Sequence, residues 1–164
     1  MRGDSKIYHQ LEAIQIPYEY YEHEAIPTIE MALIHKAHID ATHCKNIFLR
    51  NHKGNKHYFV VIEQSAQVDI HFLEQQLKQG KLSFASEQRL MKHLGVLPGA
   101  VSPLGLIYDI QKNTTVFIDS TLKEASRLSF HPNTSDASLV ISTSDLLKYI
   151  DVLNIQREWL SLQE

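Results

Sequence analysis

The sequence predicts an α+β protein in which helices surround a mixed, largely antiparallel sheet that is curled or barrel-like. Helical and strand-like apolar patterns alternate irregularly along the 164 residues. Several neighbouring strand-like segments are joined by turns too short for a parallel crossover. The hydrophobic fraction of 43% and the charged fraction of 21% are ordinary for a globular protein. This length fits one domain, so we expect residues 1–164 to form a single unit.

The N-terminal part of the chain predicts two helices and one strand. Apolar residues at helical spacing indicate a first helix over residues 5–14, capped by Asp4 or Ser5. A proline ends this helix, and the aromatic-rich residues 18–23 are typical of a strand. A second helix is expected over residues 27–38, because proline is favoured in a first helical turn.

The middle of the chain predicts a hairpin and two short helices. Residues 45–50 and 57–62 flank a polar turn that holds a glycine, which is the pattern of a β-hairpin. The second arm is apolar on consecutive residues, which indicates a strand buried on both faces at the centre of the sheet. Helices are expected after the caps Asp69 and Ser86, the first of them ending at Gly80.

The C-terminal part of the chain predicts four strands and a last helix. Residues 106–109 and 115–119 flank a short polar turn, so we expect a second hairpin there. Two further strands are expected over residues 128–130 and 138–141. A helix that begins at Ser144 follows, with its leucines spaced to face the core.

Charge and motifs exclude several classes of protein. The formal net charge of −3 argues against nonspecific binding of nucleic acid, so DNA is not an expected partner. The ten histidines lack His-x-x-x-His spacing and Cys44 is the one cysteine, so we expect no metal site, cofactor or internal disulfide. No apolar run approaches the roughly 18 residues of a membrane span, so we expect a cytoplasmic protein with no membrane partner.

A loop punctuated by glycine and proline lies between a helical and a strand-like segment, at residues 97–106. Proline restricts φ, whereas glycine permits backbone conformations that other residues avoid, so the loop is expected to be stiff. Such a loop lets a ligand approach the main chain closely, but many structural turns are built in the same way. The loop alone favours the structural interpretation.

Four stretches of the sequence carry a resemblance to a known family. They are HEAIPTIE at 23–30, CKNIFL at 44–49, a Gly-x-x-x-Pro loop at 99–103, and Phe-His-Pro at 130–132. Their order and spacing resemble the YbaK/ProX family of aminoacyl-tRNA deacylases, and more closely its ProX (PrdX-like) branch. These are freestanding relatives of the editing domain of bacterial prolyl-tRNA synthetases, and the likeness spans nearly the whole chain.

The resemblance implies a trans-acting hydrolase that removes a wrong amino acid, first of all alanine, from transfer RNA for proline. A synthetase pocket built for proline cannot strongly exclude a smaller residue, because the lost methylenes are worth only about 1–3 kcal/mol. Cysteine or serine in place of alanine remains an alternative, as does a noncatalytic module that binds a tRNA end or a protein. The implied partners are the acceptor end of mischarged tRNA(Pro) and prolyl-tRNA synthetase.

The resemblance also implies the site residues. Lys45 matches the functional lysine of the family and is expected to stabilise the oxyanion, although by itself it reads as an ordinary solvated lysine. His131 is expected to contact the terminal adenosine or its ribose, and Asn46 to hydrogen-bond the glycine loop. The remaining substrate-binding residues expected are those of the loop: Gly99, Ala100, Val101, Ser102 and Pro103.

Two features bear on RNA binding. Many relatives carry Asn-Thr where this chain has Ser135 and Asp136, so a carboxylate is expected to alter hydrogen bonding around the adenosine. Two groups of basic residues are expected to offset the negative net charge. The first group is Arg50, Lys53 and Lys56 with His52 and His57, and the second is Lys78, Lys81, Arg89 and Lys92.

Overall fold

The structure is a computed structural model that describes residues 1–25 and 38–162. Almost all of the helix expected over residues 27–38 lies outside the described residues. The helices are α1 (Ser5–Ala13), α3 (Ile70–Leu77), α4 (Glu87–Leu94) and α5 (Thr143–Val152), with the short 3₁₀ helices η1 (Pro103–Tyr108) and η2 (Ser120–Leu122). The strands are β1 (Glu19–Glu22), β2 (Thr42–Asn51), β3 (His57–Glu63), β4 (Leu82–Phe84), β5 (Thr114–Asp119), β6 (Leu128–Phe130), β7 (Ala137–Ile141) and β8 (Gln156–Leu160).

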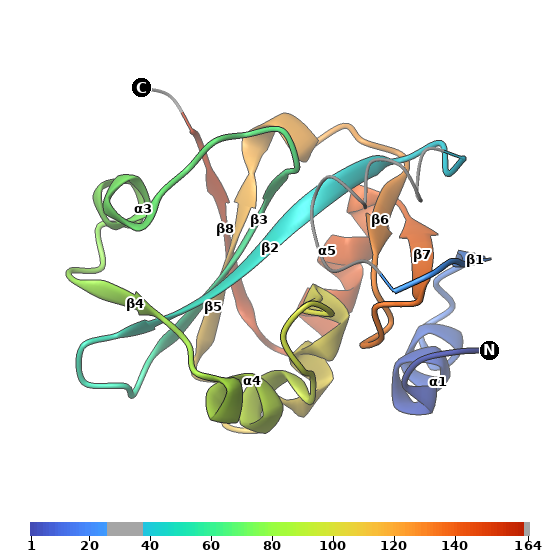
Figure 1. Cartoon of the computed structure of the whole chain (residues 1–164), viewed down its shortest axis with the longest axis horizontal. Coiled ribbons are helices and arrows are strands. Elements are labelled where there is room, and N and C mark those ends of the chain that lie inside the picture. The colour runs from blue at the N-terminus through green and yellow to red at the C-terminus, as the bar shows by residue number, and fades with distance from the viewer. Residues whose placement is uncertain (26–37, 163–164) are drawn as a thin grey trace.

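These strands form one curled, mixed sheet that does not close (Figure 1). The order is β1-β7-β6-β2-β3-β5-β8, and β4 pairs with β2 beside this path. Strand β2 is antiparallel to β3 and β4, and β7 is antiparallel to β1 and β6. The pairs β2–β6, β3–β5 and β5–β8 are parallel. The predicted class is confirmed.

The β2–β3 hairpin organises the sheet, as predicted. Lys45 pairs with Ile62 and Arg50 with His57, so the two strands are in register over nearly their whole length. Strand β3 is buried at every residue but its last and lies between β2 and β5. The run of apolar residues therefore marks a central strand, because both of its faces are covered.

The predicted second hairpin is wrong. Residues 103–108 form η1 instead of a strand, because Pro103 fixes a helical φ at its start and the Ser102 hydroxyl accepts a hydrogen bond from the Leu104 N–H. Strand β5 exists, but its partners are the parallel strands β3 and β8. Strands β4 and β8 were not predicted, since one has three residues and the other is largely exposed.

Helix caps agree well with the sequence. The side chains of Asp4, Asp69 and Ser86 accept hydrogen bonds from the first turns of α1, α3 and α4. Helix α3 ends earlier than expected, because Lys78 takes the left-handed conformation (φ 55°) before Gly80 is reached. Helix α5 is capped by Ser142, so it begins one residue earlier than expected.

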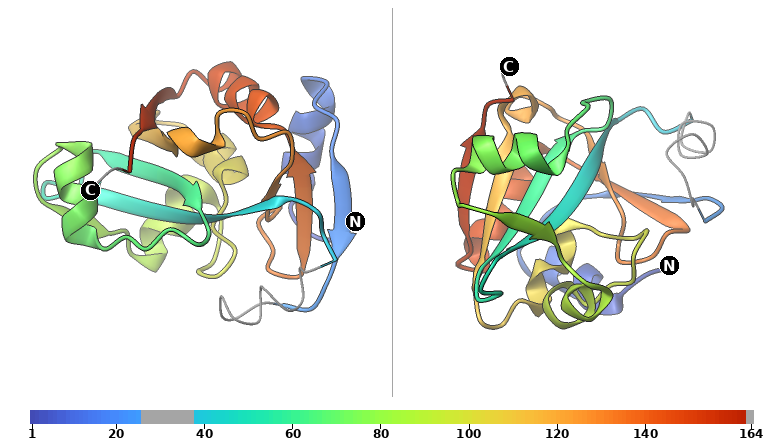
Figure 2. Two further views of the ribbon diagram at one scale, coloured as in Figure 1. Left: turned by 90° about the horizontal axis from the view of Figure 1, so that it is seen from above. Right: turned by 60° about the vertical axis from the view of Figure 1, so that its left-hand side comes forward.

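Two apolar cores lie on opposite faces of the sheet. Helix α3 covers one face, where Leu73 and Leu77 pack with Leu49 of β2. Helices α1, α4 and α5 contribute to the larger core on the other face, which includes Phe48 (Figure 2). Neighbouring residues of β2 thus point into different cores, as strand geometry requires. No helix in the described part of the chain is long and apolar enough to cross a membrane.

Candidate active site

Strand β2 has a gap in its pairing that exposes one edge. On this edge it pairs with β6 at residues 42–43 and with β4 at residues 49–51. Between them, residues 44–47 have no partner strand in the described part of the chain. Lys45 and Asn46 lie in this gap, and both are partly exposed.

The parallel pairing of β2 with β6 aligns Lys45 with His131. His43 is in register with Ser129, and the pairing ends there. Lys45 lies two residues after His43, and His131 lies two residues after Ser129. Because side chains alternate along a strand, both residues project from the same face of the sheet, although their backbones are no longer paired. The register therefore places these two predicted site residues on the same face of the sheet, each two residues beyond the last pair.

The Lys45 side chain is half-buried and its ammonium group is held by the main chain. Its Nζ donates to the carbonyl oxygen of Ala66 at 2.6 Å, in the loop after β3. Lys45 projects from the same face of β2 as Ile47 and Leu49, which belong to the core under α3. An ammonium group has three donors, so this bond fixes the position of the charge and leaves two N–H groups for other acceptors.

Asn46 projects from the opposite face of β2, together with Cys44 and Phe48. Its Oδ1 atom is buried and accepts no hydrogen bond from the described residues. The expected hydrogen bond from Asn46 to the glycine loop is therefore not made by this oxygen. A buried carbonyl oxygen without a donor is unfavourable, so Oδ1 is a ready acceptor for an N–H group that enters from the loop side.

The glycine loop packs on the face of β2 that carries Asn46. Ala100 and Val101 belong to the same core as Phe48, and both Ser102 and Pro103 are buried. Gly99 has φ +92°, which L side chains rarely adopt, and a Cβ atom there would have open space around it. Gly99 is thus required by its backbone conformation and faces an unfilled region, whereas Ser102 caps η1.

Two side chains from distant parts of the sequence fix the loop at both ends. The Asn133 amide donates to the carbonyl oxygens of Leu94 (2.9 Å) and Gly95 (3.3 Å), where α4 ends. The buried Tyr149 hydroxyl donates to the carbonyl oxygen of Leu104 at 2.6 Å, and burial raises the pKa of this tyrosine so that it keeps its proton. This role of Asn133 was not predicted. Asparagine is one of the residues that tolerate the left-handed conformation (φ 59°) found there.

His131 is held in one tautomer. Its Nδ1 is 2.8 Å from the carbonyl oxygen of Ala137, and because a carbonyl only accepts, Nδ1 carries the proton. In the neutral ring, Nε2 is then the acceptor. The ring of His23 lies edge-on at 6.0 Å, and His23 Nε2 is bonded to the buried Ser138 hydroxyl at 2.8 Å. His23 lies in the first of the four resembling stretches, but its contact with His131 could not be read from the sequence.

The carboxylate that replaces the usual residue of relatives is engaged within its own turn. Asp136 Oδ1 accepts from the Thr134 hydroxyl at 2.6 Å, and its other oxygen lies 3.7 Å from Arg2. The Thr134 hydrogen bond lowers the pKa of Asp136. The Asp136 carboxylate therefore interacts with the turn that carries His131 and with the N-terminal segment.

A second polar cluster lies at the other end of the hairpin and is closed to solvent. His57 is stacked on Phe48 and lies 4.2 Å from the ring of His93, whose Nδ1 is 3.0 Å from Asp109 Oδ1. Arg89 reaches His57 Nε2 at 3.0 Å. Desolvation lowers the pKa of His57 to about 4. The expected place of His57 in a surface basic group is therefore wrong, since it is only 1% exposed.

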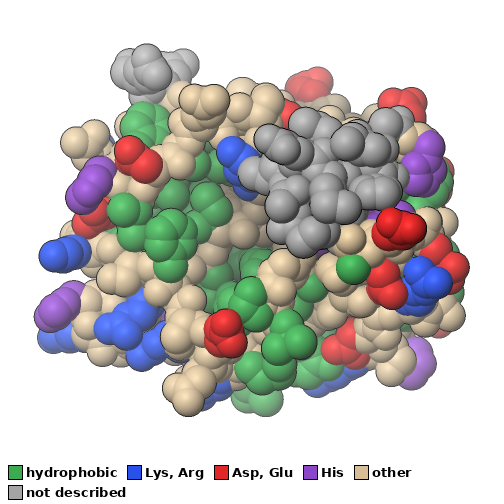
Figure 3. All heavy atoms as spheres, in the orientation of Figure 1, with side chains coloured by type: hydrophobic (Ala, Val, Ile, Leu, Met, Phe, Trp, Pro, Cys, Tyr) green, Lys and Arg blue, Asp and Glu red, His purple; other side chains and the backbone are tan. Residues whose placement is uncertain are grey.

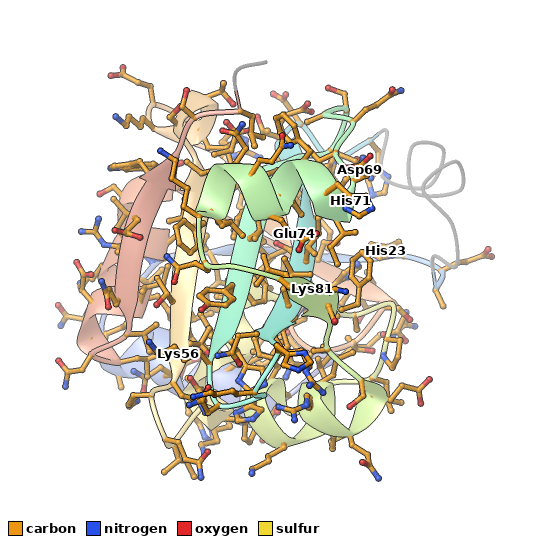
Figure 4. All side chains as sticks on the ribbon, turned by 90° about the vertical axis from the view of Figure 1, so that its left-hand side faces the viewer. His23, Lys56, Asp69, His71, Glu74 and Lys81 are labelled. Carbon is orange, nitrogen blue, oxygen red and sulfur yellow. The ribbon has the colours of Figure 1, made fainter. Side chains whose placement is uncertain are left out.

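The two predicted basic groups are continuous in the structure. Arg89 of α4 donates to the carbonyl oxygen of Gly54 in the β2–β3 turn at 2.9 Å. Helix α4 and this turn thus form one basic end of the molecule. Figure 4 shows Lys81 beside β4 and Lys56 near the hairpin turn. No group of three or more His, Cys, Asp or Glu residues that could hold a metal ion occurs within residues 1–25 and 38–162.

Fold and comparisons together define a class of enzyme, a small α+β hydrolase. Residues 23–149 match the model of the aminoacyl-tRNA editing domain, and the chain belongs to that family.

Relatives of known sequence agree with this assignment. The chain is 39% identical to the prolyl-tRNA editing protein ProX of Acetoanaerobium sticklandii, over 86% of both chains. It is 31% identical to the prolyl-tRNA synthetase associated domain-containing protein 1 of Mus musculus, over 86% of this chain and 85% of that one. A solved structure described as a candidate trans-editing enzyme for prolyl tRNA synthetase has a TM-score of 0.70 at 17% identity, covering 95% and 94% of the two chains. That last likeness concerns the fold.

Proposed function

We propose that this chain hydrolyses the ester between alanine and tRNA(Pro), acting in trans as a freestanding editing enzyme. The observation that carries the proposal is the ammonium group of Lys45, fixed by Ala66 at the gap in β2 and aligned with His131. The identity to a prolyl-tRNA editing protein supports prolyl-tRNA as the RNA. Residues 1–164 act as one editing domain in this proposal.

The chemistry needs few groups because an aminoacyl ester is already activated. Water attacks the ester carbonyl, the carbonyl oxygen becomes an oxyanion, and the ribose oxygen leaves with a proton. The two remaining N–H groups of Lys45 stabilise the oxyanion. Lys45 acts as a fixed charge and not as a nucleophile.

His131 and Asn46 position the substrate in this proposal. The neutral His131 ring accepts a hydrogen bond at Nε2 from a hydroxyl group of the terminal ribose, since its Nδ1 proton is already donated to Ala137. The Oδ1 atom of Asn46 accepts from the α-ammonium group of the amino acid, which satisfies a buried oxygen. Both contacts are made to parts of the substrate that every aminoacyl ester shares.

Selection for alanine then depends on the loop. A pocket wall fixed at both ends, by Asn133 and Tyr149, excludes the bulkier proline by overlap and admits alanine. Serine and cysteine add only one heavy atom to alanine, so they test the filter most severely. In this proposal the enzyme works in the cytoplasm on tRNA released by prolyl-tRNA synthetase, which is its functional partner.

The proposal is tested with purified protein and tRNA(Pro) charged with alanine, serine, cysteine or proline, by following release of the amino acid. We expect alanine to be released fastest and proline not above the uncatalysed rate. Release of serine or cysteine but not alanine would replace the substrate and keep the reaction. Release of none of them, at enzyme concentrations near those of the tRNA, would overturn the enzymatic assignment.

A further inference from the structure

Phe84 is a large aromatic side chain with no partner core. It is 63% exposed, although it lies in strand β4 and directly follows two residues that pair with β2. A phenylalanine in a strand ordinarily buries its ring, and Leu82 of the same strand is only 3% exposed. Leu82 anchors β4 to the core under α3, so the exposure of Phe84 does not come from fraying of the strand.

The position of Phe84 relates it to the candidate active site. Phe84 is directly opposite Leu49, and opposite residues of an antiparallel pair share a face. Leu49 and Lys45 are four residues apart on that same face of β2, which separates them by about 13 Å along the strand. A nucleotide or two of unpaired strand can span this separation.

The surroundings of Phe84 are open and include a basic residue. Lys81 precedes β4 (Figure 4), while Arg50 is opposite Ser83 and so belongs to the other face of the strand pair. Figure 3 shows hydrophobic side chains gathered to the left of the central hollow on this side of the molecule, with Lys and Arg side chains below them. An exposed aromatic ring near basic side chains is a combination with which proteins bind single-stranded nucleic acid, because every base has a face that stacks.

We propose that Phe84 is a stacking platform for an unpaired base next to the terminal adenosine of the tRNA 3′ end. The 3′ end then runs from the basic end of the molecule, formed by α4 and the β2–β3 turn, across β4 to Lys45. This inference rests on the proposed function, because it takes the tRNA acceptor end as the substrate. It adds a binding residue that contacts the RNA and not the reacting ester.

The test compares Phe84→Ala, Phe84→Leu and Phe84→Trp on alanyl-tRNA(Pro). Loss of the ring is expected to raise KM roughly tenfold and leave kcat unchanged, since stacking contributes to binding alone. Phe84→Trp keeps a stacking face and is expected to retain the wild-type KM, whereas Phe84→Leu resembles Phe84→Ala. Ile110→Ala, which removes a side chain that is 81% exposed elsewhere on the surface, is the matched control and is expected to change neither constant.

A short substrate separates the two proposals. Alanine esterified to adenosine alone offers no neighbouring base, so wild type and Phe84→Ala are expected to hydrolyse it equally. If wild type hydrolyses neither substrate, the proposed function fails. If wild type hydrolyses both and Phe84→Ala has a wild-type KM on the tRNA, the stacking proposal alone is overturned.

Binding without turnover gives an independent readout. A fluorescent adenine analogue placed next to the terminal adenosine of uncharged tRNA is expected to be quenched by wild type and by Phe84→Trp, since stacking quenches it, but not by Phe84→Ala. Quenching that is equal for all three proteins contradicts the proposal. Thermal unfolding of each variant is expected to match wild type, because the ring is mostly in solvent.

Discussion

The two ends of the β2–β3 hairpin carry similar polar residues in opposite settings. At the turn end, the buried His57 and His93 rings and Asp109 form a network that the partly exposed Arg89 joins. At the other end, Lys45 is half-buried beside an unpaired strand edge. The first cluster has the histidine and aspartate of a hydrolytic triad but no nucleophile, and its two histidines and Asp109 are buried. The comparison teaches that access and unused hydrogen-bonding capacity, more than residue type, distinguish a reactive site from a polar core.

The largest effect is expected from removing the charge at the open end. Lys45→Ala should lower kcat for alanyl-tRNA(Pro) by about 10²–10³-fold, the usual consequence of losing one oxyanion donor. Its free energy of unfolding should change by less than about 0.5 kcal/mol, since the side chain is only half-buried. Urea unfolding and single-turnover deacylation check both values. Lys148→Ala, at an exposed position of α5, is the control, and equal losses of activity in the two variants would contradict the distinction.

The converse effect is expected at the closed end. Asp109→Ala leaves the buried His93 without its partner and should reduce the free energy of unfolding by about 3 kcal/mol. Molecules that remain folded should deacylate at close to the wild-type rate per active site, because no substrate reaches this cluster. Urea titration, followed by activity measured at a temperature where the variant is folded, tests this. A loss of rate without a loss of stability would assign the cluster a catalytic part.

A smaller effect on activity is expected from replacing a glycine of the loop, compared with a glycine elsewhere. Gly99 (φ +92°) and Gly80 (φ +81°) both have open space where a Cβ atom would lie, so valine meets the same backbone strain at either position. Both Gly99→Val and Gly80→Val should therefore lose about 1–3 kcal/mol of stability. Deacylation should fall about tenfold in Gly99→Val alone, since residue 80 is remote from the loop. If Gly80→Val loses as much activity, the loop is a structural turn.

The smallest effect appears only in acid. Burial first of all, together with His93 and Arg89 beside it, lowers the folded-state pKa of His57 from the ordinary value of 6.5 to about 4. The unfolded chain then binds the proton more readily, so the stability from neutral His57 is complete above about pH 6.5 and is lost as the pH falls towards 4. Urea midpoints at pH 7, 5.5 and 4.5 should fall less steeply for His57→Gln than for wild type. Parallel curves would contradict this assignment.

Local features of this chain were readable from its sequence. The hairpin and the caps Asp4, Asp69 and Ser86 each depend on a few neighbouring residues, so their signals are complete in short windows. The strand β8 could not be predicted, because its polar residues Gln156, Arg157 and Glu158 give no apolar alternation, although it is an edge strand that pairs in parallel with β5. Helix η1 was predicted to be a strand, because a short run of buried apolar residues shows neither helical nor strand periodicity.

The candidate site was readable only in part. Lys45, His131 and the loop stand out through a family resemblance, and their roles remain a prediction. Asn133, which fixes the loop, and the packing of His57 against His93 depend on residues that are 36 or more positions apart, and no local pattern encodes such contacts. Asn46 was expected to hydrogen-bond the glycine loop. That its Oδ1 atom is buried without a donor among the described residues depends on the packing and could not be predicted.

The place of β1 at the end of the sheet has a consequence for biosynthesis. Strand β1 pairs with β7, so Glu19 has its strand partner only when Val140 has been synthesised. In addition, the Asp4 N–H donates a hydrogen bond to the carbonyl oxygen of Pro132, in the turn that carries His131. A chain emerging from the ribosome can fold the β2–β3 hairpin early, but it cannot close the edge beside His131 until some 140 residues have been made. A nascent or truncated chain therefore lacks an assembled site.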